Sequence, residues 1–191
     1  LISKNSNDLE RCRINSLHGM SRDAWKRFTG NNKYSHYDIF YPGYKYNMMD
    51  IQASLAISQF NRIEEVKSAR TKIWYEYNES FRNSIFFDIP NGINLYENSF
   101  HSKHLYILRL KDKYIEQRDD VLDYLFENQI GTGVHYLSLT QLKLYKEKDF
   151  ECNISEKIGR SCFSLPIGTN ISSSEINYIT ETLNKWKAKK N

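Results

Sequence analysis

The sequence predicts an α/β to α+β fold in which helices flank one side of a small, mostly antiparallel sheet. Three observations support this prediction. The longest helical pattern covers residues 50–81. Beyond residue 84, the segments follow in the order strand, strand, helix, strand, helix, helix, which is typical of an α+β domain. With 191 residues, of which 40% are hydrophobic, the chain can bury a sizeable core in one or two domains.

The segments that precede the long helical pattern are short. Residues 1–3 have the character of a strand end. The polar cluster Asn5–Asp8 can cap a helix, and Gly19 is expected to end that helix. One or two helical turns are predicted for residues 21–28, and the polar, tyrosine-rich residues 29–41 predict a long loop.

The long helical pattern follows a turn signal at Pro42-Gly43 and a short extended segment. Asp50 stands where a helix N-cap is expected. We expect two consecutive helices with a bend near Asn61, because the apolar residues keep roughly helical spacing on both sides of it. These apolar residues are Ile51, Leu55, Phe60, Ile63, Val66, Ile73, Tyr77 and Phe81.

The sheet is expected from three extended segments. Residues 85–89 end at a Pro-Asn-Gly turn signal, and residues 104–110 alternate as a half-buried strand does. Residues 130–136 predict a third short strand. Its glycines, Gly131 and Gly133, indicate positions that another group approaches closely.

Three helices are expected after residue 110. The first covers residues 116–128, with Val121, Leu122, Leu125 and Phe126 as its apolar positions. The second is capped by Ser155 and ends at Ser161. The last begins near Ser173, because Ser172 and Glu175 have the spacing of a capping box. Its apolar face is formed by Ile176, Ile179, Leu183 and Trp186.

Composition excludes several classes of protein. No apolar run approaches the ~20 residues that a membrane span needs, and the first residues lack a signal-peptide pattern. The net charge of +4 is too little clustered for a nucleic-acid surface. Cys12, Cys152 and Cys162 match no metal-ligand spacing and predict free thiols in a reducing compartment, so we expect a cytoplasmic protein. Because no Met opens the sequence, we expect it to begin inside a longer protein.

Residues 43–52 form a candidate anion site. Lys45 and Asn47 share one face of the extended segment, just before a helix whose N-terminal N–H groups and dipole favour an anion. The alternative is that Asp50 simply caps the helix and that the tyrosines pack.

Five motifs, taken together and in this order, resemble the DegT/StrS family of sugar aminotransferases. These are pyridoxal-phosphate (PLP) enzymes of the aspartate-aminotransferase fold, fold type I. The motifs are His18-Gly19-Met20-Ser21-Arg22-Asp23-Ala24-Trp25, the run from Gly43 to Glu65, His101-x-x-His104-Leu105-Tyr106, Ile130-Gly131-Thr132-Gly133-Val134-His135-Tyr136 and Ser164-Leu165-Pro166. They cover nearly the whole chain.

The resemblance implies a division of the chain and a set of cofactor contacts. Residues 1–60 would be the end of the PLP-binding large domain and a dimer-interface segment. Residues 61–191 would be the C-terminal small domain, including the long connecting helix. Asn47 would bind the PLP phosphate of the other subunit in a homodimer, with Lys45 and Tyr44 in the same neighbourhood.

The resemblance also implies contacts with a nucleotide-sugar substrate. His135 and Tyr136 would lie near the sugar nucleotide, and Arg22 and Trp25 would contact its nucleotide end. Thr140 stands where many relatives carry a second histidine, which puts one further substrate contact in doubt. His101 and His104 fall on opposite faces of a strand start, so packing explains them better than a shared metal does.

The function that the resemblance implies is transfer of an amino group, with glutamate as donor, to a nucleotide-linked keto sugar. The product would be an amino sugar for surface polysaccharide or lipopolysaccharide. In this family the lysine that forms the Schiff base with PLP lies upstream of the matched segments, so no catalytic residue is assigned here and the chain alone is predicted to be inactive. Two alternatives stay open: a sugar dehydratase of the same superfamily, and a non-catalytic, truncated or split-gene interaction module.

One further expectation concerns the surface. If the large domain or a dimer partner normally covers the helices of residues 50–81, the isolated chain should expose hydrophobic side chains there and self-associate.

Overall fold

The structure is a computed structural model that describes residues 3–20, 38–90, 100–146 and 151–189. The chain divides into two compact units, Leu1–Asn61 and Arg62–Asn191, which we describe separately. This boundary lies one residue after the one expected from the sequence. The strand end at residues 1–2, the helical turns at 21–28 and most of the loop at 29–41 lie outside the described residues.

The first unit begins with helix α1 (Ser6–Asn15), which is capped as expected. The side chain of Asn5 accepts a hydrogen bond from the N–H of Asn7, 2.9 Å away. The prediction that Gly19 ends this helix is wrong, because α1 already ends at Asn15. Gly19 has φ +71°, and a Cβ on it would meet the carbonyl oxygen of Tyr41. A glycine is therefore needed at position 19 because the backbone of Tyr41 passes close to it, and not because the helix ends there.

Helix α3 (Asp50–Asn61) closes the first unit. The prediction that Asp50 caps it is wrong, because Asp50 is its first helical residue. The side chain of Gln52 reaches back instead, and its Oε1 accepts from the N–H of Met49 at 3.0 Å. No residue of α3 is buried. The expected exposed hydrophobic surface is present on this helix, formed by Ile51, Leu55, Ile57 and Phe60.

The second unit begins with helix α4 (Ile63–Phe81), so the expected division of the long helical pattern at Asn61 is confirmed. Its sheet has three antiparallel strands in the order β1 (Phe87–Asp88), β2 (Tyr106–Leu110) and β3 (Cys162–Leu165). The first strand is shorter than predicted. The strand predicted for residues 130–136 is reduced to a single bridge between Gly133 and Ser164.

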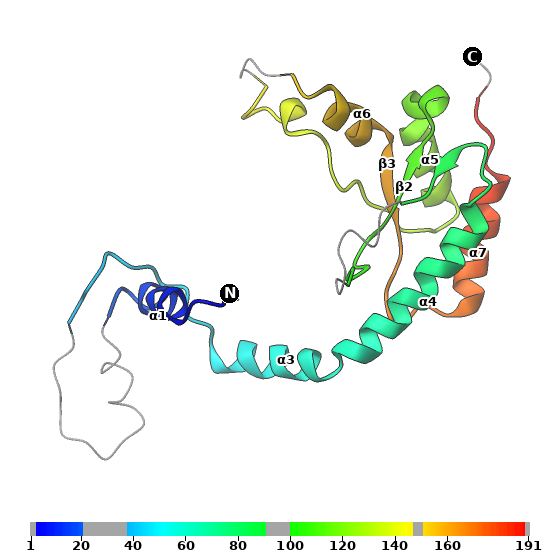
Figure 1. Ribbon diagram of the computed structural model, residues 1–191. Helices are drawn as coiled ribbons and strands as arrows, with labels where there is room; N and C mark the ends of the chain where they lie inside the picture. Colours follow the sequence, from blue (N-terminus) through cyan, green and yellow to red (C-terminus); the bar gives the residue numbers. More distant parts are fainter. Residues whose placement is uncertain (1–2, 21–37, 91–99, 147–150, 190–191) are drawn as a thin grey trace. The chain divides into compact units, whose positions relative to one another are not determined.

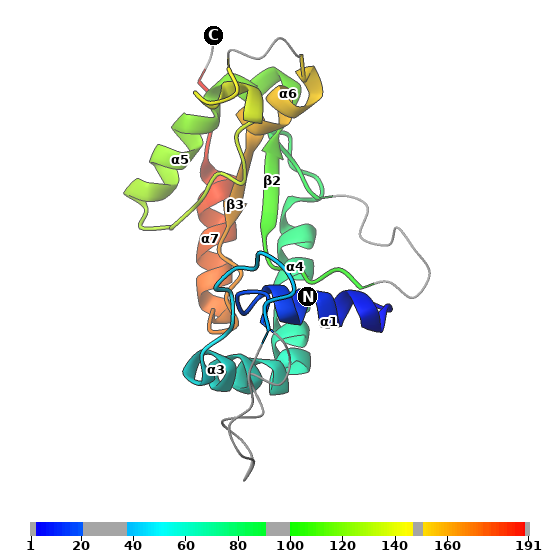
Figure 2. The same cartoon turned by 90° about the vertical axis from the view of Figure 1, so that its left-hand side faces the viewer.

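The core lies on one face of this sheet. Along β2, Tyr106, Leu108 and Leu110 are buried and alternate with half-buried residues, as a strand covered mainly on one face requires. Their neighbours on β3 in the same register are Phe163 and Leu165. Helices α4 and α7 (Ser173–Lys185) lie side by side against this face (Figures 1 and 2).

Helix α5 (Arg118–Glu127) follows a 3-10 helix, η1 (Asp112–Gln117), and contacts β3. Two of its predicted apolar positions, Val121 and Leu125, are fully buried. Phe126 is 81% exposed, so its placement on the apolar face is wrong. A second short 3-10 helix, η2 (Leu139–Gln141), lies between α5 and α6.

Helix α6 (Asn153–Ser161) ends where predicted but starts two residues before Ser155, which is therefore inside it. The capping box of α7 is confirmed: the Ser172 hydroxyl accepts from the N–H of Glu175, and the Glu175 carboxylate accepts from the N–H of Ser172 at 2.7 Å. The predicted face of α7 is buried. Among the described helices, none combines the length and the apolar character needed to cross a membrane.

Candidate functional site

Backbone hydrogen bonds hold the extended segment before α3 against the end of α1. Tyr44 N–H donates to the carbonyl of Asn15 at 2.7 Å, and Tyr46 N–H donates to the carbonyl of Ser16 at 2.8 Å. In return, His18 N–H donates to the carbonyl of Tyr44 at 2.9 Å. These bonds fix residues 44–46 as a short strand-like piece, so alternate side chains point to opposite sides.

The two sides of this piece differ in chemistry. Tyr44 and Tyr46 stack on one side, with parallel rings whose centroids are 5.0 Å apart. Lys45 and Asn47 therefore share the other side. Lys45 is exposed, and no ion pair involves it among the described residues. Tyr44 lies on the opposite side from both, which separates it from the other two predicted cofactor ligands.

Asn47 is half-buried, and its Oδ1 is shielded from solvent without a hydrogen-bond partner. A shielded amide oxygen without a donor is costly and needs a reason. Asn47 also lies three residues before the first residue of α3, where helix N–H groups favour an anion. The unpartnered Oδ1 is an acceptor and calls for a donor, whereas the groups on this side that can donate to a phosphate are the Lys45 ammonium and the Nδ2 amide of Asn47.

A second group of predicted residues lies in the second unit, around His135. Its Nδ1 is 2.8 Å from the hydroxyl oxygen of Ser164 on β3. Gly133 belongs to the same group of residues. Its backbone N–H and carbonyl form two hydrogen bonds with the backbone of Ser164, at 3.4 and 2.7 Å. A Cβ on Gly133 would lie 2.6 Å from Cε1 of His135, so the close approach predicted there is confirmed. Gly131 has open space around it, and the prediction for Gly131 is wrong.

The hydrogen bonds of Ser164 favour one tautomer of His135. The Ser164 hydroxyl donates to the carbonyl of Gly133 at 3.2 Å. A hydroxyl has one hydrogen, so both contacts are satisfied together when Nδ1–H of a neutral imidazole donates to Ser164, and in that arrangement Nε2 is a hydrogen-bond acceptor.

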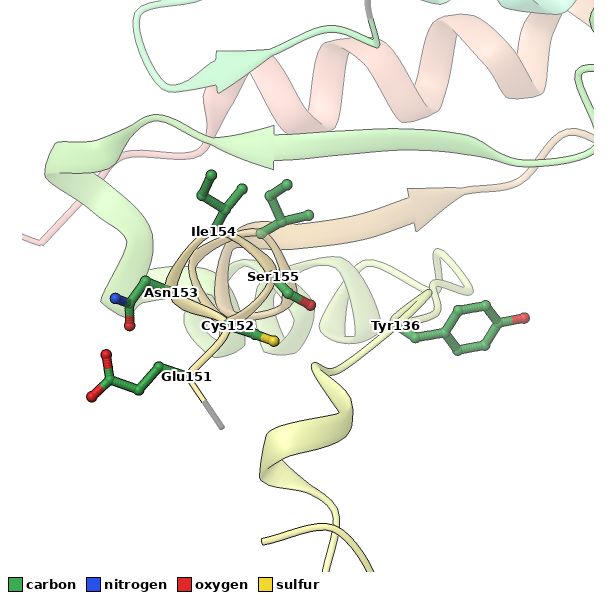
Figure 3. Close-up of a pocket in the computed structure, with 7 residues that line it drawn as sticks. Tyr136, Glu151, Cys152, Asn153, Ile154 and Ser155 are labelled. Carbon is green, nitrogen blue, oxygen red and sulfur yellow. The ribbon is translucent and has the colours of Figure 1, made fainter. Parts of the chain in front are cut away.

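Tyr136 stands beside this group with its side chain 73% exposed. Its ring packs edge-on against the His135 ring at a centroid distance of 4.9 Å. It borders an open pocket of about 750 Å³, and Figure 3 shows its ring pointing away from the helix α6 residues. The other lining residues are Glu151, Cys152, Asn153, Ile154, Ser155 and Ile158.

Close packing against α6 holds the chain that carries Tyr136. A Cβ on Gly159 would lie 2.8 Å from the backbone nitrogen of Ser138 and 3.1 Å from the carbonyl oxygen of Tyr136. The buried Sγ of Cys162 lies 3.8 Å from the same carbonyl oxygen. Burial raises the pKa of the Cys162 thiol, which keeps it protonated.

Thr140 has a structural role. Its hydroxyl donates to the carboxylate of Glu156 on α6 at 2.5 Å and lies 2.9 Å from the hydroxyl of Ser138. Thr140 therefore anchors η2 to α6 in this chain. Of the residues around His135, sequence reasoning missed Ser164, although it belongs to the Ser-Leu-Pro motif.

The remaining predicted residues are placed as follows. Arg22 and Trp25 lie outside the described residues. The ring of His101 packs against Trp74 at 5.3 Å, and His104 Nδ1 lies 3.3 Å from the Ser102 hydroxyl. In the part of the chain that the structure describes, no three His, Cys, Asp or Glu side chains gather as a metal site would require.

Comparisons with known proteins identify relatives along nearly the whole chain. The model of the DegT/DnrJ/EryC1/StrS aminotransferase family matches residues 1–184. The spore coat polysaccharide biosynthesis protein SpsC of Bacillus subtilis is 30% identical over 184 residues, covering 91% of this chain and 45% of SpsC. An uncharacterised protein of Methanocaldococcus jannaschii is 32% identical over 190 residues, covering 97% and 48% of the two chains.

Solved structures agree with these matches. Spr1654 of Streptococcus pneumoniae, in its PMP form, is 30% identical with a TM-score of 0.76, covering 94% of this chain and 43% of that one. PseC of Helicobacter pylori, an aminotransferase involved in pseudoaminic acid biosynthesis, has a TM-score of 0.81 at 19% identity, covering 96% and 47%. At that identity the likeness concerns the fold alone. The chain spans about half the length of the relatives that it matches.

Proposed function

The chain belongs to the DegT/DnrJ/EryC1/StrS aminotransferase family, a family of sugar aminotransferases, and from this premise we propose its function. It is the C-terminal portion of a PLP-dependent enzyme that transfers an amino group from glutamate to a nucleotide-linked keto sugar. The product serves amino-sugar synthesis for surface polysaccharide or lipopolysaccharide. The observation that carries the proposal is the family match over residues 1–184.

Asn47 and Lys45 would hold the phosphate of PLP in the complete enzyme. The support is chemical: the exposed ammonium of Lys45 and the Nδ2 donor of Asn47 share one side of a backbone piece that hydrogen bonds hold in place. Bound PLP supplies the electron sink that amino transfer needs. Tyr44, stacked on Tyr46, keeps this piece extended instead of facing the phosphate.

The PLP molecule whose phosphate Asn47 and Lys45 would hold belongs to the partner subunit of a homodimer. The exposed apolar residues of α3, which begins three residues after Asn47, support this arrangement because such a surface favours association. Asn47 then completes an active site whose other residues the partner supplies. We propose a cytoplasmic homodimer.

His135 and Tyr136 would bind the nucleotide sugar. Ser164 and Gly133 hold the imidazole so that Nε2 can accept a hydrogen bond from a sugar hydroxyl. The exposed phenol of Tyr136 can donate to or accept from the same ligand. Arg22 and Trp25 remain proposed contacts to the nucleotide end.

The chain alone is proposed to be inactive. Amino transfer needs a lysine that holds the cofactor and moves a proton between carbon atoms. The resemblance places that lysine in the part of the relatives that this chain does not match. The full chemistry is therefore assigned to the complete protein.

Activity of the complete protein tests this proposal. It is incubated with PLP, glutamate and nucleotide-linked 4-keto or 3-keto sugars, and 2-oxoglutarate and the amino sugar are quantified. We expect both products in equal amounts, with none from the 191-residue chain alone. Loss of a sugar hydroxyl without amine formation would contradict the proposal and favour a dehydratase.

A further inference from the structure

Arg118 is a mostly buried arginine at the start of α5. It is the first residue of that helix, and its side chain is 14% exposed. Its Nη1 donates to the carbonyl oxygen of Gly159 at 3.3 Å and to that of Cys162 at 3.5 Å. The exposed carboxylate of Asp119 accepts from Nε at 2.5 Å. The charge of Arg118 is therefore paired, and its buried nitrogen is directed at two backbone carbonyls.

These two carbonyls lie where α6 ends and β3 begins. Gly159 belongs to the last turn of α6, where carbonyl groups lack partners within the helix, and Cys162 is the first residue of β3. A cation is favourable at this end of a helix, and a charged donor forms a stronger hydrogen bond with a carbonyl than a neutral donor does. Arg118 therefore ties the last turn of α6 to the first residue of β3.

The same two residues support the chain that carries Tyr136. A Cβ on Gly159 would lie 2.8 Å from the backbone nitrogen of Ser138 and 3.1 Å from the carbonyl oxygen of Tyr136, so the two backbones are in close contact. The Sγ of Cys162 lies 3.8 Å from the Tyr136 carbonyl oxygen and 3.9 Å from that of Gly159. Arg118 thus holds both residues on which the segment 136–138 rests.

The segment around Tyr136 spans from β3 to α6. On one side of Tyr136, the backbone of Gly133 pairs with Ser164 of β3 at 2.7 and 3.4 Å. On the other side, the hydroxyl of Thr140 donates to the carboxylate of Glu156 of α6 at 2.5 Å. Because the segment is anchored to both elements, a displacement of α6 relative to β3 must change the conformation of the residues between the two anchors.

We propose that Arg118 is a positioning residue for binding of the nucleotide sugar: it locks α6 to β3 and thereby sets the place of His135 and Tyr136. This inference rests on the proposed function of those two residues. Arg118 acts on them through the junction of α6 and β3. A guanidinium group suits this role because its planar set of N–H donors can bond a carboxylate and two carbonyls at once, which an ammonium on a flexible stem does less well.

Steady-state kinetics of the complete protein, with a nucleotide-linked keto sugar as the varied substrate, test the proposal. Arg118→Met should raise KM for the sugar about tenfold and change kcat by less than about twofold, because a displaced His135 weakens binding of the sugar without moving the cofactor. Arg118→Lys should raise KM only about threefold, since the ammonium keeps the charge and can still reach one carbonyl. The lysine variant decides the question if the methionine variant does not fold.

The thiol of Cys162 reports the same junction without substrate. It is fully buried, and its alkylation by iodoacetamide in the native complete protein is followed by mass spectrometry of the peptide that contains it. We expect Arg118→Met to speed this reaction about tenfold, because the junction opens more often. Burial raises the pKa of the thiol and the Arg118 charge partly opposes this, so loss of the charge alone would slow the reaction.

Arg160→Met is the matched control. Arg160 also lies on α6, and its Nη1 is 3.3 Å from the carboxylate of Glu116 on η1, but its side chain is 51% exposed. Exposed ion pairs contribute little, so this variant should keep both KM and the rate of Cys162 alkylation. The Tm of every variant is measured alongside.

Three results would overturn the proposal. The first is an unchanged KM in Arg118→Met, or in Arg118→Lys if only that variant folds, even where Cys162 reacts faster, because Arg118 would then be a structural residue. The second is a fall in kcat as large as the fall in kcat/KM. The third is an equal effect of Arg160→Met. Absence of turnover by the unchanged complete protein would instead overturn the proposed function, and this role of Arg118 with it.

Discussion

Nδ1 of His135 lies 2.8 Å from the hydroxyl of Ser164, although 29 positions separate the two residues in the sequence. The contact joins two of the motifs on which the family resemblance rests, the Gly-Thr-Gly-Val-His-Tyr run and the Ser-Leu-Pro segment. When the Ser164 hydroxyl donates onward to Gly133, the neutral imidazole donates from Nδ1 and accepts at Nε2.

Ser164→Ala should therefore release His135 without unfolding the sheet. We expect a rise in KM for the nucleotide sugar of about tenfold in the complete protein, with a smaller change in kcat, because the imidazole loses its fixed tautomer. Nitrogen NMR of the imidazole checks the cause, since Nδ1 should be the protonated nitrogen only in the unchanged protein. Ser161→Ala, which removes a serine hydroxyl bonded within α6, is the control.

Gly133→Ala should also weaken binding of the nucleotide sugar, because the added methyl group collides with the ring of His135. Its Cβ would lie 2.6 Å from Cε1 of His135 and must displace the ring. We expect a loss of kcat/KM of about tenfold or more and a free energy of unfolding lower by about 1–3 kcal/mol. The matched substitution is Gly131→Ala, which meets no atom within 4 Å. Equal effects of the two changes would refute this account of Gly133.

The apolar surface of α3 should make the isolated chain self-associate. Its Leu55 and Phe60 are 65% and 71% exposed. We expect sedimentation velocity to show dimers or larger species at micromolar concentration, and Leu55→Gln with Phe60→Gln to shift the chain toward monomer. A Phe126→Gln variant changes a residue on α5 that is even more exposed, at 81%, and should not shift the chain toward monomer. A dilute monomer for the unchanged chain would argue against the prediction.

The capping box of α7 predicts a dependence of stability on pH. The hydroxyl of Ser172 and then its backbone N–H bond the Glu175 carboxylate and lower its pKa in the folded chain. A lowered folded pKa means that this stabilisation is present above the unfolded pKa of about 4.3 and is lost as the pH falls through the folded value. Tm should therefore drop below about pH 4, and Ser172→Ala should lower Tm and flatten this part of the curve. An unchanged acid limb in that variant would count against the prediction.

Local signals were enough to predict several elements. The Ser172–Glu175 spacing located the start of α7, and the apolar spacing around Asn61 located the division between α3 and α4. Both depend on neighbours along the chain, which a sequence displays directly.

Other features depend on distant neighbours and could not be predicted in this way. The segment 130–136 alternates like a strand, but only Gly133 pairs with β3, because the following residues turn to pack on α6. The role of Ser164 appears only once segments far apart in sequence meet.

The central claim is that Asn47 completes the active site of a partner subunit, and subunit mixing tests it most directly. The complete protein carrying Asn47→Ala is mixed with the complete protein lacking its cofactor-holding lysine, each inactive or strongly impaired alone. A hybrid dimer then contains one site with an intact lysine and an intact Asn47 from the other subunit. We predict that activity recovers to about a quarter of the unchanged level, as random pairing of subunits gives. No recovery in a mixture shown to contain hybrid dimers would contradict the claim, because Asn47 would then serve the site of its own subunit.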